Sequence, residues 1–270
     1  MRGGYHGWLE EGAAFGRRLE VPGPLLPLIL NLGGPFLVSR AGAARETPVG
    51  SFVAGLDDAW SLVGSDGPSC CIQLDLTPPG ARRLLGVPGC ELAGRVVELD
   101  DLPAWRAAGL PERLRELCTW EERFAALDAF LLGRLAAGPP ADPGLEHVWR
   151  RLEASDGRLP VGTVAAELGW SRKRLLTACR REAGAAPKLL ARLVRFERLV
   201  GRLRAEPSPS LADAAYGCGY YDQAHLNRDF RELAGTTPTR FLAARLPDGG
   251  GVTERAAPGT SVQDGGTPGT

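Results

Sequence analysis

Short apolar runs, interrupted by glycine and proline, fill the first hundred positions of the chain. Turn-forming pairs such as GG, PG and DG separate these runs. Apolar runs of this length between turn signals are typical of β-strands. We therefore expect a compact β-rich domain. Its predicted strands cover residues 25–32, 36–39, 49–54, 71–76 and 95–99.

The pattern changes between residues 111 and 137, where leucine and phenylalanine recur at helical spacing with charged residues between them. This spacing predicts one helix, or two helices broken near Thr119. The sequence AGPPADPG then interrupts all periodicity, as a linker does. We therefore predict a first domain over residues 1–137 and a linker over residues 138–144.

An internal repeat follows the linker. SRKRLLTACRREAGAAPKLL, which begins at Ser171, aligns without gaps to DQAHLNRDFRELAGTTPTRF, which begins at Asp222. Each copy opens with a residue that can cap a helix N-terminus. Each also closes with a glycine that suits a helix C-terminus, followed three residues later by proline. The repeat therefore predicts two similar helices with defined ends.

A shorter helical pattern precedes each copy, at residues 161–168 and 210–216, and a turn containing glycine follows it. A helix, a tight turn and a capped second helix form the helix-turn-helix arrangement, so we predict two such units. Helical spacing over residues 188–204 predicts one long helix between them. We assign residues 145–246 to this second domain. Residues 247–270, rich in glycine, threonine and proline, are expected to be disordered.

The net charge of zero conceals a division along the chain. Residues 145–246 hold 18 Lys and Arg against 11 Asp and Glu, a net charge of +7, whereas residues 1–144 have a net charge of −5. A basic domain beside an acidic one favours a nucleic-acid-binding domain joined to a different domain. The longest apolar run, residues 25–32, is far shorter than the roughly 20 residues of a membrane span. We expect a cytoplasmic protein with no membrane contact.

The second copy of the repeat resembles the AraC/XylS family of bacterial transcription regulators. LADAAYGCGYYDQAHLNRDFRELAGTTPTRFL follows that family's order of a small-residue helix, a GY turn, D-Q, a helix ending in F-R, and G-x-x-P. In the first copy, Cys179 stands where the family usually has phenylalanine, which predicts a smaller core side chain. Residues 5–38 look like the start of a sensor domain found in some relatives, and many sensor domains of the family are cupin-like barrels. The resemblance implies an α+β protein, with a β-rich regulatory domain before an all-α domain of two helix-turn-helix units.

Polar residues of the second copy project away from its apolar seam, which Leu226 and Phe230 form. Gln and Asn can pair with adenine and Arg with guanine. Any one of these residues is explained equally well as part of an ordinary exposed helix face, but the repeat and the basic charge favour DNA contact. His225 borders the seam and is expected to be structural or phosphate-facing. Together with positions implied by the family resemblance, the predicted DNA-binding residues are Arg172, Lys173, Leu176, Thr177, Gln223, Ala224, Asn227 and Arg228.

A rigid connection between the two units would let their helices enter successive major grooves about 34 Å apart. The predicted partner is therefore double-stranded DNA with two short boxes one helical turn apart. Both boxes would be bound by a single polypeptide.

The N-terminal half carries little sign of catalysis. Enzymatic cupins hold a metal with several histidines and a carboxylate, and the only histidine before the linker is His6, so we predict no metal and no cofactor. Cys70, Cys71 and Cys90 lack the four-cysteine cluster of alkylation-repair relatives, and buried thiols are the simpler expectation. We expect a regulator and not an enzyme. The alternative is a DNA repair protein or other enzyme with an appended DNA-binding domain.

A small-molecule effector and a homodimer are the remaining expected partners. Aromatic residues of the β-rich region could line an effector pocket or simply form core. The helices over residues 111–137 could mediate dimerisation. The aromatic candidates are Trp8, Phe15, Phe36, Phe52 and Trp60.

Overall fold

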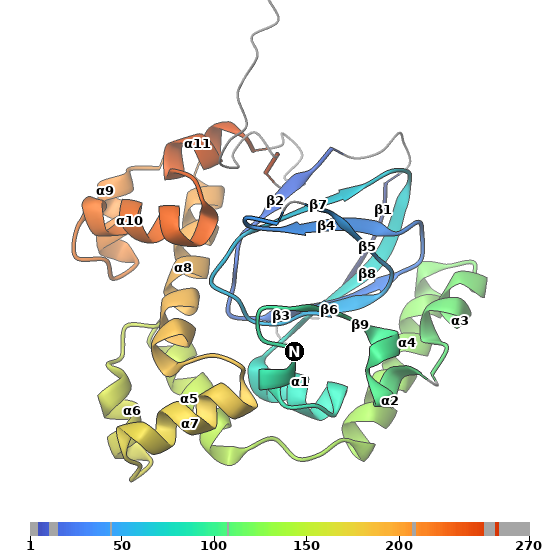
Figure 1. Cartoon of the computed structure of the whole chain (residues 1–270), viewed down its shortest axis with the longest axis horizontal. Helices are drawn as coiled ribbons and strands as arrows, with labels where there is room; N and C mark the ends of the chain where they lie inside the picture. Colours follow the sequence, from blue (N-terminus) through green and yellow to red (C-terminus); the bar gives the residue numbers. More distant parts are fainter. Residues whose placement is uncertain are drawn as a thin grey trace, which may run out of the picture.

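The computed structural model describes residues 5–10, 16–43, 45–106, 108–206, 209–245 and 252–253. Two parts are evident in Figure 1: a pair of β-sheets with helices beside them, and a group of helices arranged around one long helix. The expected α+β fold, with a β-rich N-terminal part and a helical C-terminal part, is confirmed.

Two antiparallel sheets face each other in the N-terminal part. The five-stranded sheet has the order β1 (Tyr5–Glu10), β8 (Ser69–Leu76), β3 (Leu26–Asn31), β6 (Phe52–Ala54), β9 (Val96–Glu98). The four-stranded sheet has the order β2 (Arg18–Glu20), β7 (Ser61–Ser65), β4 (Phe36–Arg40), β5 (Thr47–Val49).

Alternation along β3 explains how the five-stranded sheet packs on both faces. Ile29 points into a small cluster that also holds Phe36 of the other sheet, so it belongs to the layer between the sheets. Leu28 and Leu30 point the opposite way and are completely buried in the larger core. Successive side chains of a strand lie on opposite faces, and here both faces are covered.

Helices cover the outer face of the five-stranded sheet (Figure 1). They are α1 (Pro78–Leu85), α2 (Pro103–Arg106), α3 (Leu110–Glu116) and α4 (Trp120–Ala137), with the 3₁₀ turns η1 (Gly89–Glu91) and η2 (Leu99–Asp101). The predicted break near Thr119 is confirmed, since Thr119 caps α4 in a capping box with Glu122.

The C-terminal part is all helical. Its elements are α5 (Pro143–Ala154), α6 (Val161–Glu167), α7 (Arg172–Glu182), α8 (Pro187–Ala205), α9 (Leu211–Gly217), α10 (Gln223–Ala234) and α11 (Pro238–Ala243). The two predicted helix-turn-helix units are α6 with α7 and α9 with α10. The predicted long helix is α8, which runs between the units in Figure 1. Phe196, Leu199 and Leu203 of α8 are fully buried, so this helix forms the core of the domain.

The two parts meet where η1 lies against the end of α7. A Cβ atom on Gly89 would lie 2.4 Å from the carbonyl carbon of Ala183, and one on Gly184 would lie 2.4 Å from the carbonyl oxygen of Gly89. The buried carboxylate of Glu182 lies 3.8 Å from the guanidinium of Arg82 on α1. The first helix-turn-helix unit is therefore packed directly against the N-terminal domain.

Several local predictions need correction. The single strand predicted over residues 49–54 is two short strands, because Gly50 and Ser51 turn the chain between β5 and β6. Strands β1, β2 and β7 and helix α1 were not predicted. The thiols are not all buried, since Cys90 and Cys118 are exposed.

The predicted disordered tail has two described residues, and both pair with other parts of the chain. Val252 accepts a 2.7 Å hydrogen bond from the amide of Leu19 on β2 and is completely buried. The amide of Thr253 donates to the carbonyl oxygen of Ala244. The disorder prediction is therefore wrong at residues 252–253, and the rest of 247–270 lies outside the described residues.

Candidate nucleic-acid interface

Side-chain caps fix the start of both candidate recognition helices. The Ser171 hydroxyl accepts a 3.1 Å hydrogen bond from the amide of Arg174, and the Asp222 carboxylate accepts a 2.7 Å bond from the amide of His225. Such caps satisfy amides that have no partner within the helix. Gly184 and Gly235 have positive φ just after each helix, as the repeat predicts.

A buried seam holds each recognition helix to its domain. Leu175 and Cys179 form it in α7, and both are almost completely buried. In α10 the equivalent positions are Leu226 and Phe230. The Phe230 ring lies in edge contact with Phe196 of α8, at 5.2 Å between ring centroids. Each helix therefore presents its opposite face outward.

The predicted DNA-binding residues lie on these outward faces. Six of the eight are exposed, whereas Leu176 and Asn227 are half-buried beside the seams. The exposed six are Arg172, Lys173, Thr177, Gln223, Ala224 and Arg228.

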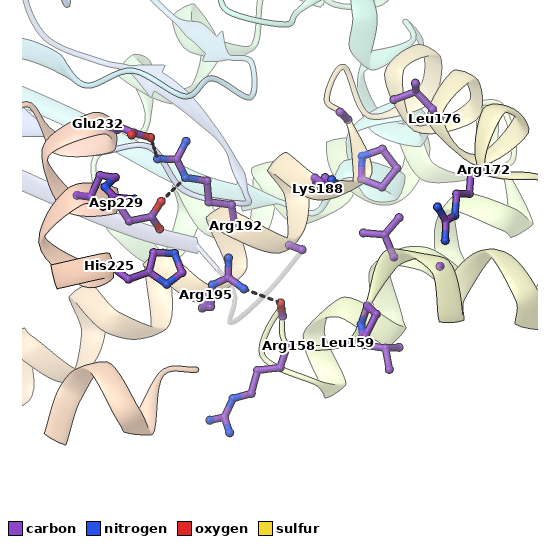
Figure 2. Close-up of a pocket in the computed structure, with 18 residues that line it drawn as sticks. Arg158, Leu159, Arg172, Leu176, Lys188, Arg192, Arg195, His225, Asp229 and Glu232 are labelled. Carbon is purple, nitrogen blue, oxygen red and sulfur yellow. Dashed lines mark hydrogen bonds and ion pairs between the residues drawn. The ribbon is translucent and has the colours of Figure 1, made fainter. Parts of the chain in front are cut away.

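A groove of about 890 Å³ lies between the two helix-turn-helix units (Figure 2). Of the predicted residues, Arg172, Leu176 and Arg228 line its walls, so both recognition helices border the same groove. Arg172 also lies along α6, where its guanidinium is near Gly162. His225 lines the groove and packs its ring against Tyr220 at 5.3 Å, which agrees with a structural role.

Four basic residues of the groove escaped sequence reasoning: Arg158, Lys188, Arg192 and Arg195. The last three lie on α8, and the sequence treats that helix only as a connector. Their spacing of three and four residues is the one available signal, because it places them on one face of α8.

Arg192 is the centre of an ion-pair network at the second unit. Its guanidinium contacts the carboxylates of both Asp229 and Glu232 on α10, as Figure 2 shows. Asp229 also accepts a 3.0 Å hydrogen bond from the hydroxyl of Tyr220. Burial, reinforced by the charge of Asp229, raises the pKa of Tyr220, so its hydroxyl stays protonated and keeps donating.

Two further arginines connect the first unit to its surroundings. Arg195 of α8 donates a 3.4 Å hydrogen bond to the carbonyl oxygen of Gly157, in the loop after α5 (Figure 2). Arg158, the next residue of that loop, donates a 2.5 Å bond to the carbonyl oxygen of Gly217 at the end of α9. The first bond ties that loop to α8, and the second ties it to the second unit.

A second cavity, of about 510 Å³, lies between the two β-sheets and reaches α8. Of the predicted aromatic lining, Trp8, Phe36 and Phe52 border it, whereas Trp60 packs against the main core and Phe15 lies outside the described residues. Its remaining walls combine apolar with charged side chains. These include Ile29, Val38, Val200, Arg18, Glu20, Gln73, Asp75, Glu197 and Arg204.

One carboxyl group of this cavity has a shifted pKa. Desolvation raises the pKa of Glu20, while the positive charges of Arg204 and Arg18 lower it, and the net direction is upward. The cavity wall therefore offers both carboxyl and guanidinium groups beside its apolar surface. Within the described ranges, no three His, Cys, Asp or Glu side chains gather where they could hold a metal ion.

Comparisons with known proteins agree with both halves of this description. A family model described as a helix-turn-helix domain matches residues 164–244. No curated protein shows a significant match to the sequence. In the part of the chain that the structure describes, no helix has both the length and the apolarity to cross a membrane.

Among solved structures, the fold is similar to that of ToxT from Vibrio cholerae O395. The TM-score is 0.52 at 12% identity, over 88% of this chain and 97% of that chain. ToxT from the same strain bound to (E)-4-(8-methylnaphthalen-1-yl)but-3-enoic acid gives a TM-score of 0.51 at 11% identity, over 88% and 98% of the two chains. The two chains therefore share a fold that includes the sheets as well as the helices.

Proposed function

We propose that the chain is a DNA-binding transcription regulator of the AraC/XylS family and that its two helix-turn-helix units bind two boxes of one DNA site. The observation that best supports this proposal is that α7 and α10 are both capped and both border one groove beside α8. We propose that these helices enter successive major grooves, with the boxes about one helical turn apart. We keep residues 145–246 as the DNA-binding domain and 1–137 as the regulatory domain, joined by 138–144.

Residues on the outward face of α10 would specify the second box. Gln223 and Asn227 carry amides that can pair with adenine, and Arg228 can pair with guanine. Ala224 can make only apolar contact. Each good bidentate contact discriminates by about 1–3 kcal/mol against the wrong base.

The first box would be recognised with different chemistry. Lys173 can bind guanine or a phosphate, while Leu176 and Thr177 offer methyl groups to a thymine methyl. Arg172 lies closer to α6 and is better placed for the DNA backbone. We therefore expect the second box to have the sharper base preference.

Selection of fragments from random DNA by the purified chain tests this proposal. We expect an enriched site with two boxes about 10 base pairs apart, from centre to centre. Arg228→Ala should lose base preference at one position of the second box only. Arg231→Ala is the matched control, since Arg231 is an exposed arginine one turn further along the same helix. Affinity that is independent of both sequence and salt would refute DNA recognition, because phosphate contacts make binding fall steeply with salt.

We further propose that a small molecule with an apolar body and a polar end occupies the cavity between the sheets. ToxT, which shares the fold, binds an aromatic carboxylic acid. Here the cavity pairs apolar walls with Arg18, Glu20 and Arg204. Because α8 forms part of the wall, an occupant would touch the helix that carries both DNA-binding units. The regulatory site would then lie next to the element it has to influence.

Gly201 of α8 provides a sharp test of the cavity. A Cβ atom at this position would meet nothing within 4 Å, so a larger side chain can enter the open space. We expect some aromatic or aliphatic carboxylic acids to raise the Tm of the wild-type chain and to change its DNA affinity. Gly201→Phe should abolish that response, and Gly201→Ala should retain it. A response that survives Gly201→Phe would place the effector elsewhere.

Dimerisation and location complete the proposal. We propose that α4, whose Leu132 is 67% exposed, contributes to a homodimer contact. Sedimentation of Leu132→Glu against wild type tests this contact.

The chain would act in the cytoplasm, as a regulator and not as an enzyme. The fold shared with ToxT extends through the N-terminal domain, which favours this view over a repair enzyme with an appended DNA-binding domain.

A further inference from the structure

We propose that Arg192 is a positioning residue that fixes α10 relative to the first helix-turn-helix unit and thereby sets the box spacing that the protein accepts. This inference rests on the proposed two-box recognition. Arg192 faces the groove from α8 and belongs to neither recognition helix, yet it would determine which distance between the two boxes the protein binds.

The contact is bidentate and partly enclosed. Arg192 uses Nε toward Asp229 and Nη2 toward Glu232, so two donors on one edge of the planar group engage two positions one turn apart on α10. The side chain of Arg192 is 23% exposed and that of Asp229 only 8%. A planar guanidinium held at two points restricts rotation as well as distance, which a single point charge cannot do.

Asp229 transmits this restriction to the start of α10. Its second carboxylate oxygen accepts from Tyr220, which precedes the capping residue Asp222 by two positions. Arg192 is therefore coupled to the turn of the second unit as well as to its recognition helix. Phe196, one turn along α8, packs edge-on against Phe230. That contact joins α10 to α8 at a single ring, whereas the two ion pairs hold α10 at two points and so restrict how it is rolled about its own axis.

The same segment of α8 holds the loop that leads into the first unit. Gly157 approaches Ala191 so closely that a Cβ atom on Gly157 would lie 2.2 Å from the Ala191 carbonyl oxygen. Arg195, three residues after Arg192, holds the Gly157 carbonyl oxygen. The second unit and the loop that leads into the first unit are thus both fixed to residues 191–195 of α8, and a change at Arg192 alters one attachment while it leaves the other in place.

Geometry links this attachment to box spacing. Moving one box by a single base pair turns it by about 35° around the duplex and shifts it by about 3.4 Å. A second unit fixed by two ion pairs cannot follow that movement without breaking them. Without these two ion pairs, the second unit can roll and follow it.

The experiment uses the whole chain and three DNA duplexes that carry the two selected boxes. In one duplex the boxes have the spacing found by selection, and in the other two they are one base pair closer or one base pair further apart. We expect the wild type to prefer one spacing by about tenfold or more, the cost of losing one base contact. Arg192→Lys retains the charge but reaches one carboxylate only. It should reduce the preference to about threefold or less, with little loss of affinity for an isolated second box.

A double variant tests the same contact without leaving a buried charge that could unfold the protein. Arg192→Gln with Asp229→Asn leaves no buried carboxylate without its partner, so it avoids the penalty of Arg192→Ala. Its Tm and circular dichroism should resemble those of the wild type, and its spacing preference should fall as in Arg192→Lys. Lys188→Ala is the matched control: it removes a positive charge from the same groove, one turn earlier on α8. It should weaken binding at every spacing equally.

The outcomes separate this inference from the proposal beneath it. A wild-type chain with no enriched two-box site would overturn both. If the wild type shows a spacing preference, and both Arg192→Lys and the folded double variant keep it, only the role of Arg192 is overturned. An equal loss of preference in Lys188→Ala would also overturn it, because charge in the groove would then explain the effect.

Discussion

The guanidinium of Arg158 donates a 2.5 Å hydrogen bond to the carbonyl oxygen of Gly217, which joins the loop before the first helix-turn-helix unit to the second unit without passing through α8. Arg158 also lies against Gly219, where a Cβ atom would be 3.0 Å from its Cγ. The loop before α6 is therefore in direct contact with the turn of the second unit.

We expect Arg158→Ala to weaken binding to a two-box site by about two- to tenfold, since one net hydrogen bond contributes about 0.5–1.5 kcal/mol. Binding to a single box should change little, because each unit keeps its own helices. Fluorescence anisotropy with one-box and two-box duplexes measures the difference. Arg150→Ala, an exposed arginine of α5, is the control. Equal effects on one-box and two-box duplexes would show that Arg158 simply contacts phosphate.

The turn glycines predict a difference in stability between the two units. Gly169 and Gly219 both have positive φ, at 62° and 77°, so an alanine at either position costs about 1–2 kcal/mol. A side chain at Gly169 meets nothing within 4 Å, whereas one at Gly219 also displaces Arg158. Denaturant unfolding should therefore rank Gly219→Ala as more destabilising than Gly169→Ala. The reverse order would mean that the Arg158 contact is absent in solution.

The core of the second unit depends on an aromatic group that the first unit lacks. Phe230 packs against Phe196 and, at 5.3 Å, against Phe241. We expect Phe230→Ala to cost about 3–5 kcal/mol of unfolding free energy. The equivalent change in the first unit, Cys179→Ala, should cost only about 1 kcal/mol, because it removes one buried sulfur atom. Urea unfolding of the two variants checks this ratio, and similar losses would contradict it.

Thiol reactivity should divide the cysteines by burial. Burial raises the pKa of Cys71 and of Cys179 to about 12, so neither forms the reactive thiolate at pH 8 in the folded chain. Cys90 and Cys118 are exposed. Mass spectrometry after brief maleimide treatment should find label on Cys90 and Cys118 and none on Cys71 and Cys179, and urea should expose these two. Native labelling of Cys179 would mean that the first unit opens readily.

The same shifts predict a loss of stability in alkali. The thiol pKa is higher in the folded chain than its ordinary value of 9.0, so above pH 9 the unfolded chain loses protons that the folded chain keeps. The contribution of these groups is therefore complete below pH 9 and declines as pH rises toward 12. Cys71→Ser should lessen that decline. Unfolding free energies measured at pH 8 and pH 10.5 provide the comparison.

The parts of the fold that sequence predicted are those with strong local signals. Ser171 and Asp222 are capping residues, and Thr119 begins a capping box, so the helix starts were visible in the residues themselves. Strand β2 has three residues and β7 contains Gly64, too short or too broken for a periodic pattern. The pairing of Arg192 with Asp229 crosses 37 residues. No local pattern distinguishes such a pair from two solvated charges.

The burial of Val252 beside β2 has a practical consequence for dividing the molecule. The amide of Leu19 donates outward from the edge of the four-stranded sheet, and the carbonyl oxygen of Val252 is its acceptor. A fragment that holds only the N-terminal domain would leave this strand edge open to pairing between copies, which promotes aggregation. A fragment cut at the end of the helix-turn-helix match would likewise remove the residues that cover Leu19. Measurements on isolated halves would then describe a surface that the intact chain keeps covered.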